Sequence, residues 1–262
     1  MNLNNNIINF QTEILNPLTQ FEIRDWFSIS ILDNMHLSIT NIAFYLVISS
    51  IFILILSLLS TNYNRVVSNN WSIGQESLYE TIHSLVINQI NSKNGQIYFP
   101  FIYTLFIFIL INNLIGLIPY SFASTSHFIL TFALSFTIVL GTTLLGFHKH
   151  NLKFFALFVP GGCPLALLPL LVLIEFISYL ARNISLGLRL AANITAGHML
   201  LNILSGFVYN IMSTGFLYAI LALLPLAFII AFSGLELGIA VIQAQVFVVL
   251  TSSYIKDGLE LH

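Results

Sequence analysis

LALLPLLVLIEFISYLARNISLGLRLAANITAGHMLLNILS, residues 165–205, decides the fold of this chain. A helix of about 40 residues is about 60 Å long, roughly twice the hydrocarbon thickness of a bilayer. Its only formal charges are Glu175, Arg182 and Arg189. An arginine keeps its proton in an apolar environment and costs about 3 kcal/mol or more at mid-bilayer. Each of these charges must therefore either form an ion pair or serve a function within the membrane.

The composition excludes a soluble domain. Of 262 residues, 57% are hydrophobic and 7% are charged, whereas soluble domains carry about 25% charged residues. The sequence predicts an all-α polytopic membrane protein with about five membrane-embedded helices and one amphipathic helix. The net charge of -2 without a basic run argues against nucleic acid binding, and no Gly-Lys-Ser/Thr element indicates a nucleotide site in this chain.

The N-terminal tail bears on whether a leader is removed, and the single cysteine bears on disulfide and metal chemistry. Residues 1–40 form an acidic N-terminal tail that lacks a basic signal region. Removal of a short leader before Asn16 remains open. Cys163 is the single cysteine, so an internal disulfide and a cysteine-rich metal site are excluded. We expect Cys163 to be a small packing residue.

The first transmembrane helix is predicted at residues 41–60, which are uncharged. Residues 61–97 follow as an inner-side segment with an amphipathic helix. Its apolar residues recur at helical spacing: Leu78, Ile82, Leu85, Val86 and Ile90. This face predicts a helix that either lies on the membrane surface or packs against a partner subunit, and the sequence leaves both open.

Residues 98–147 are predicted as a transmembrane hairpin, with spans at about 98–120 and 128–147, and residues 148–164 as a basic loop. Basic residues of loops favour the inner side of a membrane. This rule assigns to the inner side the segments that carry Arg65, Lys93, Lys149 and Lys153. The N-terminus is then outside and the C-terminus inside, in agreement with the number of spans.

Residues 165–262 are predicted as a tilted helical hairpin, with helices at about 165–205 and 216–254. Each stretch is about twice as long as a perpendicular crossing needs, and no polar connector interrupts either one. The turn is expected between Gly206 and Gly215. Pro225 should kink the second helix, because proline lacks a backbone N–H and crowds the preceding turn.

Polar side chains follow both long helices at a spacing of seven residues. Glu175, Arg182 and Arg189 therefore share one face of the first helix, and Asn193 lies near it. His198 is nine residues beyond Arg189 and faces another neighbour. The second helix repeats the spacing with polar residues on or close to one line, namely Glu236, Gln243, Tyr254 and Asp257.

Antiparallel packing of the two helices sorts these groups by depth. Glu175 and Asp257 lie toward the inner surface, and His198 and Glu236 lie toward the outer half. Arg189 separates them, so the pattern indicates two proton half-paths that are kept apart by a permanent cation.

Structural roles for the same residues stay open. Arg189 paired with Glu236 would form a purely structural ion pair, whereas Arg182 should reach Glu175 only poorly along the helix. Asn193 and Gln243 could serve only as interhelical hydrogen-bond partners. Arg182 could tune the interface, or pair with a neighbouring subunit or a lipid headgroup.

The run SLGLRLAAN at residues 185–193 closely resembles subunit a of the F-type ATP synthases, the stationary proton-channel subunit of the membrane sector. The similarity covers most of the chain and is greatest with mitochondrial, fungal forms. It continues in IPYSF at 118–122, GLEL at 234–237, IQA at 242–244 and YIKD at 254–257. Gln245 departs from the family, in which an aromatic residue is common.

The resemblance implies a role for each polar residue. Arg189 would face the rotor ring of carboxylate-bearing subunits. Glu175 and Asp257 would line the matrix half-channel, and His198 and Glu236 the intermembrane-space half-channel. Supporting polar positions would be Asn193, Gln243, Arg182 and Tyr254.

The resemblance also implies the setting of the chain. It would be a multi-pass subunit of the mitochondrial inner membrane, not catalytic by itself, with its N-terminus on the intermembrane-space side and its C-terminus in the matrix. Its partners would be the rotor ring, other membrane-sector and peripheral-stalk subunits, and the lipid bilayer. It would need no cofactor, since protons are the transported ion.

A secondary transporter and an ion-paired anchor subunit of a respiratory complex are the rival functions.

Overall fold

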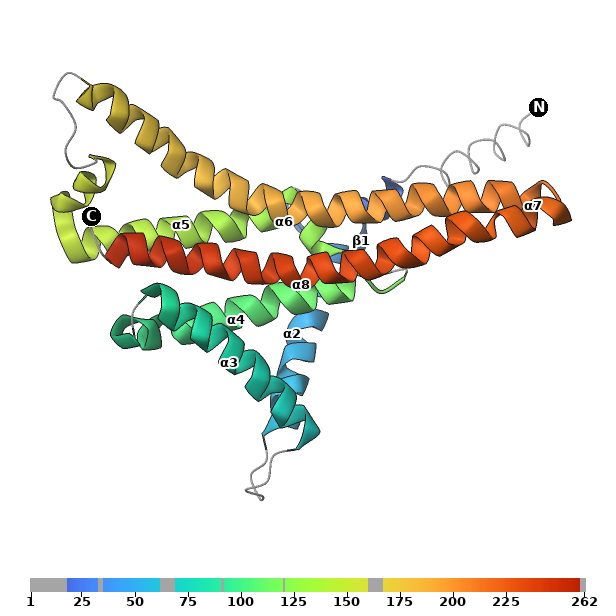
Figure 1. Cartoon of the computed structure of the whole chain (residues 1–262), viewed down its shortest axis with the longest axis horizontal. Coiled ribbons are helices and arrows are strands. Elements are labelled where there is room, and N and C mark those ends of the chain that lie inside the picture. The colour runs from blue at the N-terminus through green and yellow to red at the C-terminus, as the bar shows by residue number, and fades with distance from the viewer. Residues whose placement is uncertain are drawn as a thin grey trace.

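The computed structural model describes residues 18–32, 35–61, 69–90, 92–119, 121–159 and 167–259. Arg65, Cys163 and the possible leader before Asn16 lie outside these ranges, as do the expectations that concern them. The described chain is helical apart from one β-hairpin near its N-terminus (Figure 1).

Five helices in this part of the chain are long and apolar enough to cross a membrane. They are α2 (Asn41–Ser60), the segment Gly95–Gly116 of α4 (Ser92–Gly116), α5 (Phe128–His150), α6 (Leu168–Ser213) and α8 (Leu223–Leu259). The prediction of an all-α polytopic membrane protein with about five membrane-embedded helices is therefore confirmed.

The α2 helix has the same bounds that the sequence predicts, and it points away from the other long helices (Figure 1). Ser49 is the one residue of α2 that is buried in the described structure. The exposed part of this apolar surface is thus left for lipid or for other proteins.

A small antiparallel hairpin precedes α2 and was not predicted from the sequence. It consists of β1 (Asp25–Leu32) and β2 (Met35–Thr40), with Asp25 opposite Thr40 and Phe27 opposite Ile39. The sequence of both strands alternates apolar and polar residues, which is the period of a strand. This hairpin ends directly at the start of α2.

Helix α3 (Asn70–Ile90) corrects one prediction. The apolar residues Ile82, Val86 and Ile90 are at most 1% exposed and form one core with residues of α4 and α8. This face is therefore covered by other helices of the chain and not by lipid or a partner subunit, while the place of α3 at the membrane surface stays a prediction. The helical period was correct, but a period identifies a face and not what covers it.

The hairpin of α4 and α5 turns through η2 (Ser124–Ser126). Helix α5 extends to His150, three residues beyond the predicted span, so the first residues of the predicted basic loop form its last turn. Cations are favourable there because the carbonyl end of a helix is partly negative. The chain continues as η3 (Asn151–Phe158).

The tilted hairpin of α6 and α8 is confirmed, with one change of bounds. Helix α6 runs through Gly206 to Ser213, a length of about 69 Å, and the chain turns at Gly215, whose φ of 156° is open to glycine. A short helix, α7 (Phe216–Leu221), precedes α8. The break lies at Ala222, because Pro225 has no N–H for the carbonyl of Leu221.

Two glycines lie at close approaches of α5 to the two long helices, which run beside it in Figure 1. A Cβ at Gly187 of α6 would lie 2.8 Å from Ser135 Oγ. A Cβ at Gly258 of α8 would lie 3.1 Å from the carbonyl oxygen of Thr142. Small residues at such positions allow the backbones of membrane helices to approach closely.

Candidate functional site

The predicted charged residues of α6 and α8, together with His198, fall into three places along the hairpin. Glu175, Arg182 and Asp257 form one group, here called the Arg182 cluster. His198 and Glu236 form a second, the Glu236 cluster. On α6, Arg189 lies between the two.

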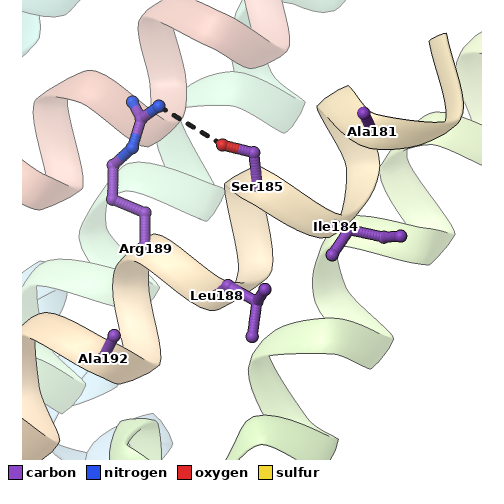
Figure 2. A pocket seen from close by; sticks show the side chains of 6 residues that line it. All are labelled: Ala181, Ile184, Ser185, Leu188, Arg189 and Ala192. Carbon is purple, nitrogen blue, oxygen red and sulfur yellow. Dashed lines mark hydrogen bonds between the residues drawn. The ribbon is translucent and has the colours of Figure 1, made fainter. Parts of the chain in front are cut away.

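Arg189 is exposed on an apolar surface. It lines a shallow, open depression of about 460 Å³, together with Ser185 and four apolar residues of the same helix: Ala181, Ile184, Leu188 and Ala192. Figure 2 shows Arg189 and Ser185 projecting to the same side of α6, one turn apart. Arg189 Nη2 donates a hydrogen bond of 3.5 Å to Ser185 Oγ, which is long and therefore weak.

Within the described residues Arg189 forms no salt bridge, and the ion pair with Glu236 that the sequence left open is not present. The carboxyl of Glu236 instead lies beside His198, about nine residues along α6 from Arg189. An exposed, unpaired cation on an apolar membrane surface is costly in lipid. It is therefore suited to a partner that presents a carboxylate.

The Arg182 cluster corrects a second expectation. Arg182 Nη1 lies 3.1 Å from Asp257 Oδ2, and Arg182 Nη2 lies 3.6 Å from Glu175 Oε1. Arg182 thus pairs with both carboxylates, although the sequence analysis expected it to reach Glu175 only poorly. That expectation counted only the helical rise, whereas a long side chain of a helix leans toward the N-terminus and shortens the gap.

The Arg182 cluster also adjoins two tyrosines. Asp257 and Tyr254 line a small cavity with Thr142 of α5 and Tyr179 of α6. The sequence analysis singled out Tyr254 but missed Thr142 and Tyr179. Tyr179 lies four residues after Glu175, so its place on the polar face was available from the helical period.

In the Glu236 cluster, His198 Nε2 lies 3.8 Å from Glu236 Oε1. Glu236 is 4% exposed, and neither of its carboxyl oxygens has a hydrogen-bond partner among the described residues. His198 Nε2 is also buried without a partner in the same part of the chain. Polar atoms that are buried but unpaired are unusual in folded proteins, so they indicate a place for water or an exchangeable proton.

A polar bridge joins the two helices between Arg189 and the Glu236 cluster. Asn193 Nδ2 donates a hydrogen bond of 3.0 Å to Gln243 Oε1. Gln243 is 5% exposed, and its Nε2 has no hydrogen-bond partner in the described structure. The bridge fixes the register of α6 against α8 at this level.

The sequence analysis missed buried polar groups of α4 and η2 near the same hairpin. Asn113 Nδ2 donates to the carbonyl oxygen of Ala240 at 3.3 Å, and Asn113 Oδ1 is left without a partner among the described residues. Thr125 is fully buried, and within the same ranges its Oγ1 is unpaired. An asparagine within an apolar span was the available signal.

Comparison with known proteins gives the family. Residues 43–256 match the sequence profile described as ATP synthase A chain. The chain belongs to this family. The match confirms the resemblance that the run at residues 185–193 indicates.

Relatives of the ATP synthase A chain family match along nearly the whole chain. The protein named ATP synthase subunit a of Neurospora crassa is 76% identical over 254 residues, which are 97% of this chain and 97% of the relative. Its namesake in Podospora anserina is 73% identical over 264 residues and covers 100% of both chains. The one in Emericella nidulans is 71% identical over 251 residues, 95% of this chain and 98% of the relative.

Proposed function

We propose that this chain is the stationary proton-conducting subunit of the membrane sector of an F-type ATP synthase in the mitochondrial inner membrane. It forms two offset half-channels that serve a rotating ring of carboxylate-bearing subunits. The observation that carries the proposal is Arg189, exposed between two separate polar clusters and without a salt bridge among the described residues. Catalysis of ATP formation belongs to another sector of the complex.

Proton uptake occurs at the Glu236 cluster on the intermembrane-space side. Glu236 and His198 offer a carboxyl and an imidazole 3.8 Å apart, which is too long for direct transfer and suits an intervening water or a small side-chain movement. The proton then neutralises a carboxylate of the ring. A neutral carboxylic acid can turn into lipid, whereas an ionised one carries a large desolvation cost.

Proton release occurs at the Arg182 cluster on the matrix side, after nearly a full turn of the ring. Glu175 and Asp257 accept the proton, and Arg182, 3.1 Å from Asp257 and 3.6 Å from Glu175, holds the two carboxylates together at this end of the hairpin. The exposed fraction of each of these side chains is about one third, so water can reach the carboxylates from this end.

Arg189 keeps the two half-channels apart. Its guanidinium cannot give up its proton, and it favours the ionised form of a ring carboxylate that comes opposite it. Protons therefore cross only when the ring carries them. Each crossing supplies about 2.3 kcal/mol per 100 mV, which the ring transmits as torque.

The membrane orientation follows from the same proposal. The N-terminus lies on the intermembrane-space side and the C-terminus in the matrix. The basic residues Lys149, Lys153 and Lys256 are then on the matrix side, as the positive-inside rule favours.

Replacing Arg189 tests this function. We expect Arg189→Ala to abolish ATP synthesis driven by an imposed proton gradient and to raise the passive proton leak, both measured with the assembled complex in lipid vesicles. Ser205→Ala is the matched control, because Ser205 is exposed on the same helix and bonds only within it. Full ATP synthesis by Arg189→Ala would refute the role of Arg189.

A further inference from the structure

Phe21 lies against the imidazole of His198, although the two residues are at opposite ends of the sequence. Their ring centroids are 6.2 Å apart at an interplanar angle of 80°, an edge-to-face arrangement. Phe21 is the last residue of η1 (Thr19–Phe21), and the side chain of His198 is 18% exposed. A residue before the first transmembrane helix thus covers part of the Glu236 cluster.

The segment that carries Phe21 is fixed to the start of α2. The backbone N–H of Asn41 donates to the carbonyl oxygen of Arg24 at 3.2 Å, and Asn41 Nδ2 donates to that of Glu22 at 3.5 Å. Trp26 stacks on Phe44 in the first turn of α2, with ring centroids 4.8 Å apart. Phe21 is therefore held in place through α2.

The orientation of His198 depends on its neighbours. The χ2 torsion of histidine is broad, so the side chain alone does not select one ring orientation. Within the part of the chain that the structure describes, Nε2 of the imidazole has no hydrogen-bond partner to fix it. Phe21 packs on one side of the ring, and Nε2 lies toward Glu236. A phenyl ring neither accepts nor donates a transferable proton, so it can orient the imidazole and exclude water from that side without opening a second proton path.

We propose that Phe21 is a positioning residue for proton uptake, and that the segment 18–26 forms the outer wall of the Glu236 cluster. Phe21 holds the imidazole of His198 with Nε2 toward Glu236 and shields it from bulk water. This inference rests on the proposed function, since it assigns Phe21 to the uptake half-channel.

The first test measures proton-driven ATP synthesis by the assembled complex in vesicles. We expect Phe21→Ala to reduce the rate about two- to tenfold, the range that an aromatic contact supplies. Phe21→Tyr keeps the ring and should keep the rate. Phe21→Leu keeps only apolar volume, so its rate should fall nearly as far as that of Phe21→Ala. Leu58→Ala is the control, because Leu58 is an exposed apolar residue of α2 outside the segment 18–26. Wild-type rates with both Phe21→Ala and Phe21→Leu would overturn the proposal.

The second test asks whether Phe21 acts through His198. Phe21→Ala should add no further loss in a His198→Ala background, and an equal further loss would overturn the positioning role. If His198→Ala alone has the wild-type rate, the proposed uptake path itself has failed, which separates the two conclusions.

The third test needs no activity. In a Cys163→Ser, His198→Cys chain, a membrane-impermeant thiol reagent added on the intermembrane-space side should label position 198 faster when Phe21→Ala is also present. An unchanged labelling rate would overturn the covering role of the segment. Because labelling is read from the chain itself, it decides the question even where a variant cannot synthesise ATP.

Discussion

Gly197 of α6 stands directly against Glu236 of α8. A Cβ at position 197 would lie 2.5 Å from the carboxyl Oε1 of Glu236, closer than real Cβ contacts allow. The carboxyl thus occupies the space that any larger residue at position 197 would fill. The location of Glu236, and with it the geometry of the Glu236 cluster, depends on a residue without a side chain.

Gly197→Ala should therefore slow proton uptake nearly as much as Glu236→Gln does. The added methyl group forces the carboxyl away from its present place beside His198. The measurement is the rate of proton flux through the assembled complex at several driving forces. Gly206→Ala is the matched control, because nothing lies within 4 Å of its Cβ position on the same helix. Unchanged flux in Glu236→Gln at every driving force would contradict the role of Glu236, and unchanged flux in Gly197→Ala would contradict the dependence of its geometry on Gly197.

Arg182→Met should slow proton release with little effect on assembly. The substitution removes the cation that lies 3.1 Å from Asp257 and 3.6 Å from Glu175, and it retains apolar length. Ion pairs that are about one third exposed contribute little to stability, about 0–1 kcal/mol, so the amount of assembled complex should be near normal.

ATP-driven proton pumping measures this effect on release. Lys256→Met removes a positive charge next to Asp257 in sequence, but Lys256 is exposed and forms no ion pair in the described ranges, so pumping should persist. Equal pumping by Arg182→Met and the wild type would exclude a role in release, whereas loss of the whole complex would indicate a structural role for the pair.

Much of the fold was predictable because a membrane imposes long apolar helices. The bounds of α2 and the tilted hairpin follow directly from apolar length. The seven-residue spacing also sorted the polar residues into groups along the hairpin, because helix geometry relates spacing to face.

Contacts between distant segments were not predictable in the same way. The amphipathic face of α3 was identified, but its cover by α4 and α8 is a tertiary fact. The contact of Phe21 with His198 depends on how the chain returns to the long helices. The N-terminal β-hairpin is local, and the alternation of its two strands was the signal that could have predicted it. The reach of Arg182 toward Glu175 was underestimated. The length and lean of the side chain, and not the backbone rise alone, decide whether two charges meet.

Gln89 should stabilise the end of α8 that carries the Arg182 cluster. Its Oε1 accepts hydrogen bonds from Ser252 Oγ and, at 3.1 Å, from Ser253 Oγ, so it joins α3 to α8. Gln89→Leu would leave both hydroxyls without this acceptor and should cost about 1 kcal/mol. The expected result is faster thermal inactivation of the assembled complex. Gln89→Glu keeps an acceptor and should be milder.

Thr81→Ala is the control for Gln89→Leu, because Thr81 is exposed on α3 and bonds only within the helix. An unchanged inactivation rate in Gln89→Leu would show that the apolar contacts of α3 suffice to hold α8.

His127 should make the complex less stable in acid. It lies just before α5, stacks on Phe122 and has a buried Nε2 without a partner among the described residues, and burial lowers its pKa from the usual 6.5. Because the unfolded chain then binds a proton more readily than the folded one, stability is complete above about pH 6.5 and falls as the pH drops below it. His127→Phe should remove this part of the acid sensitivity. The measurement compares the rate of thermal inactivation at about pH 7.5 with that at about pH 5.5. His148→Phe changes an exposed histidine and should retain it. The same acid sensitivity in His127→Phe and the wild type would refute the assignment.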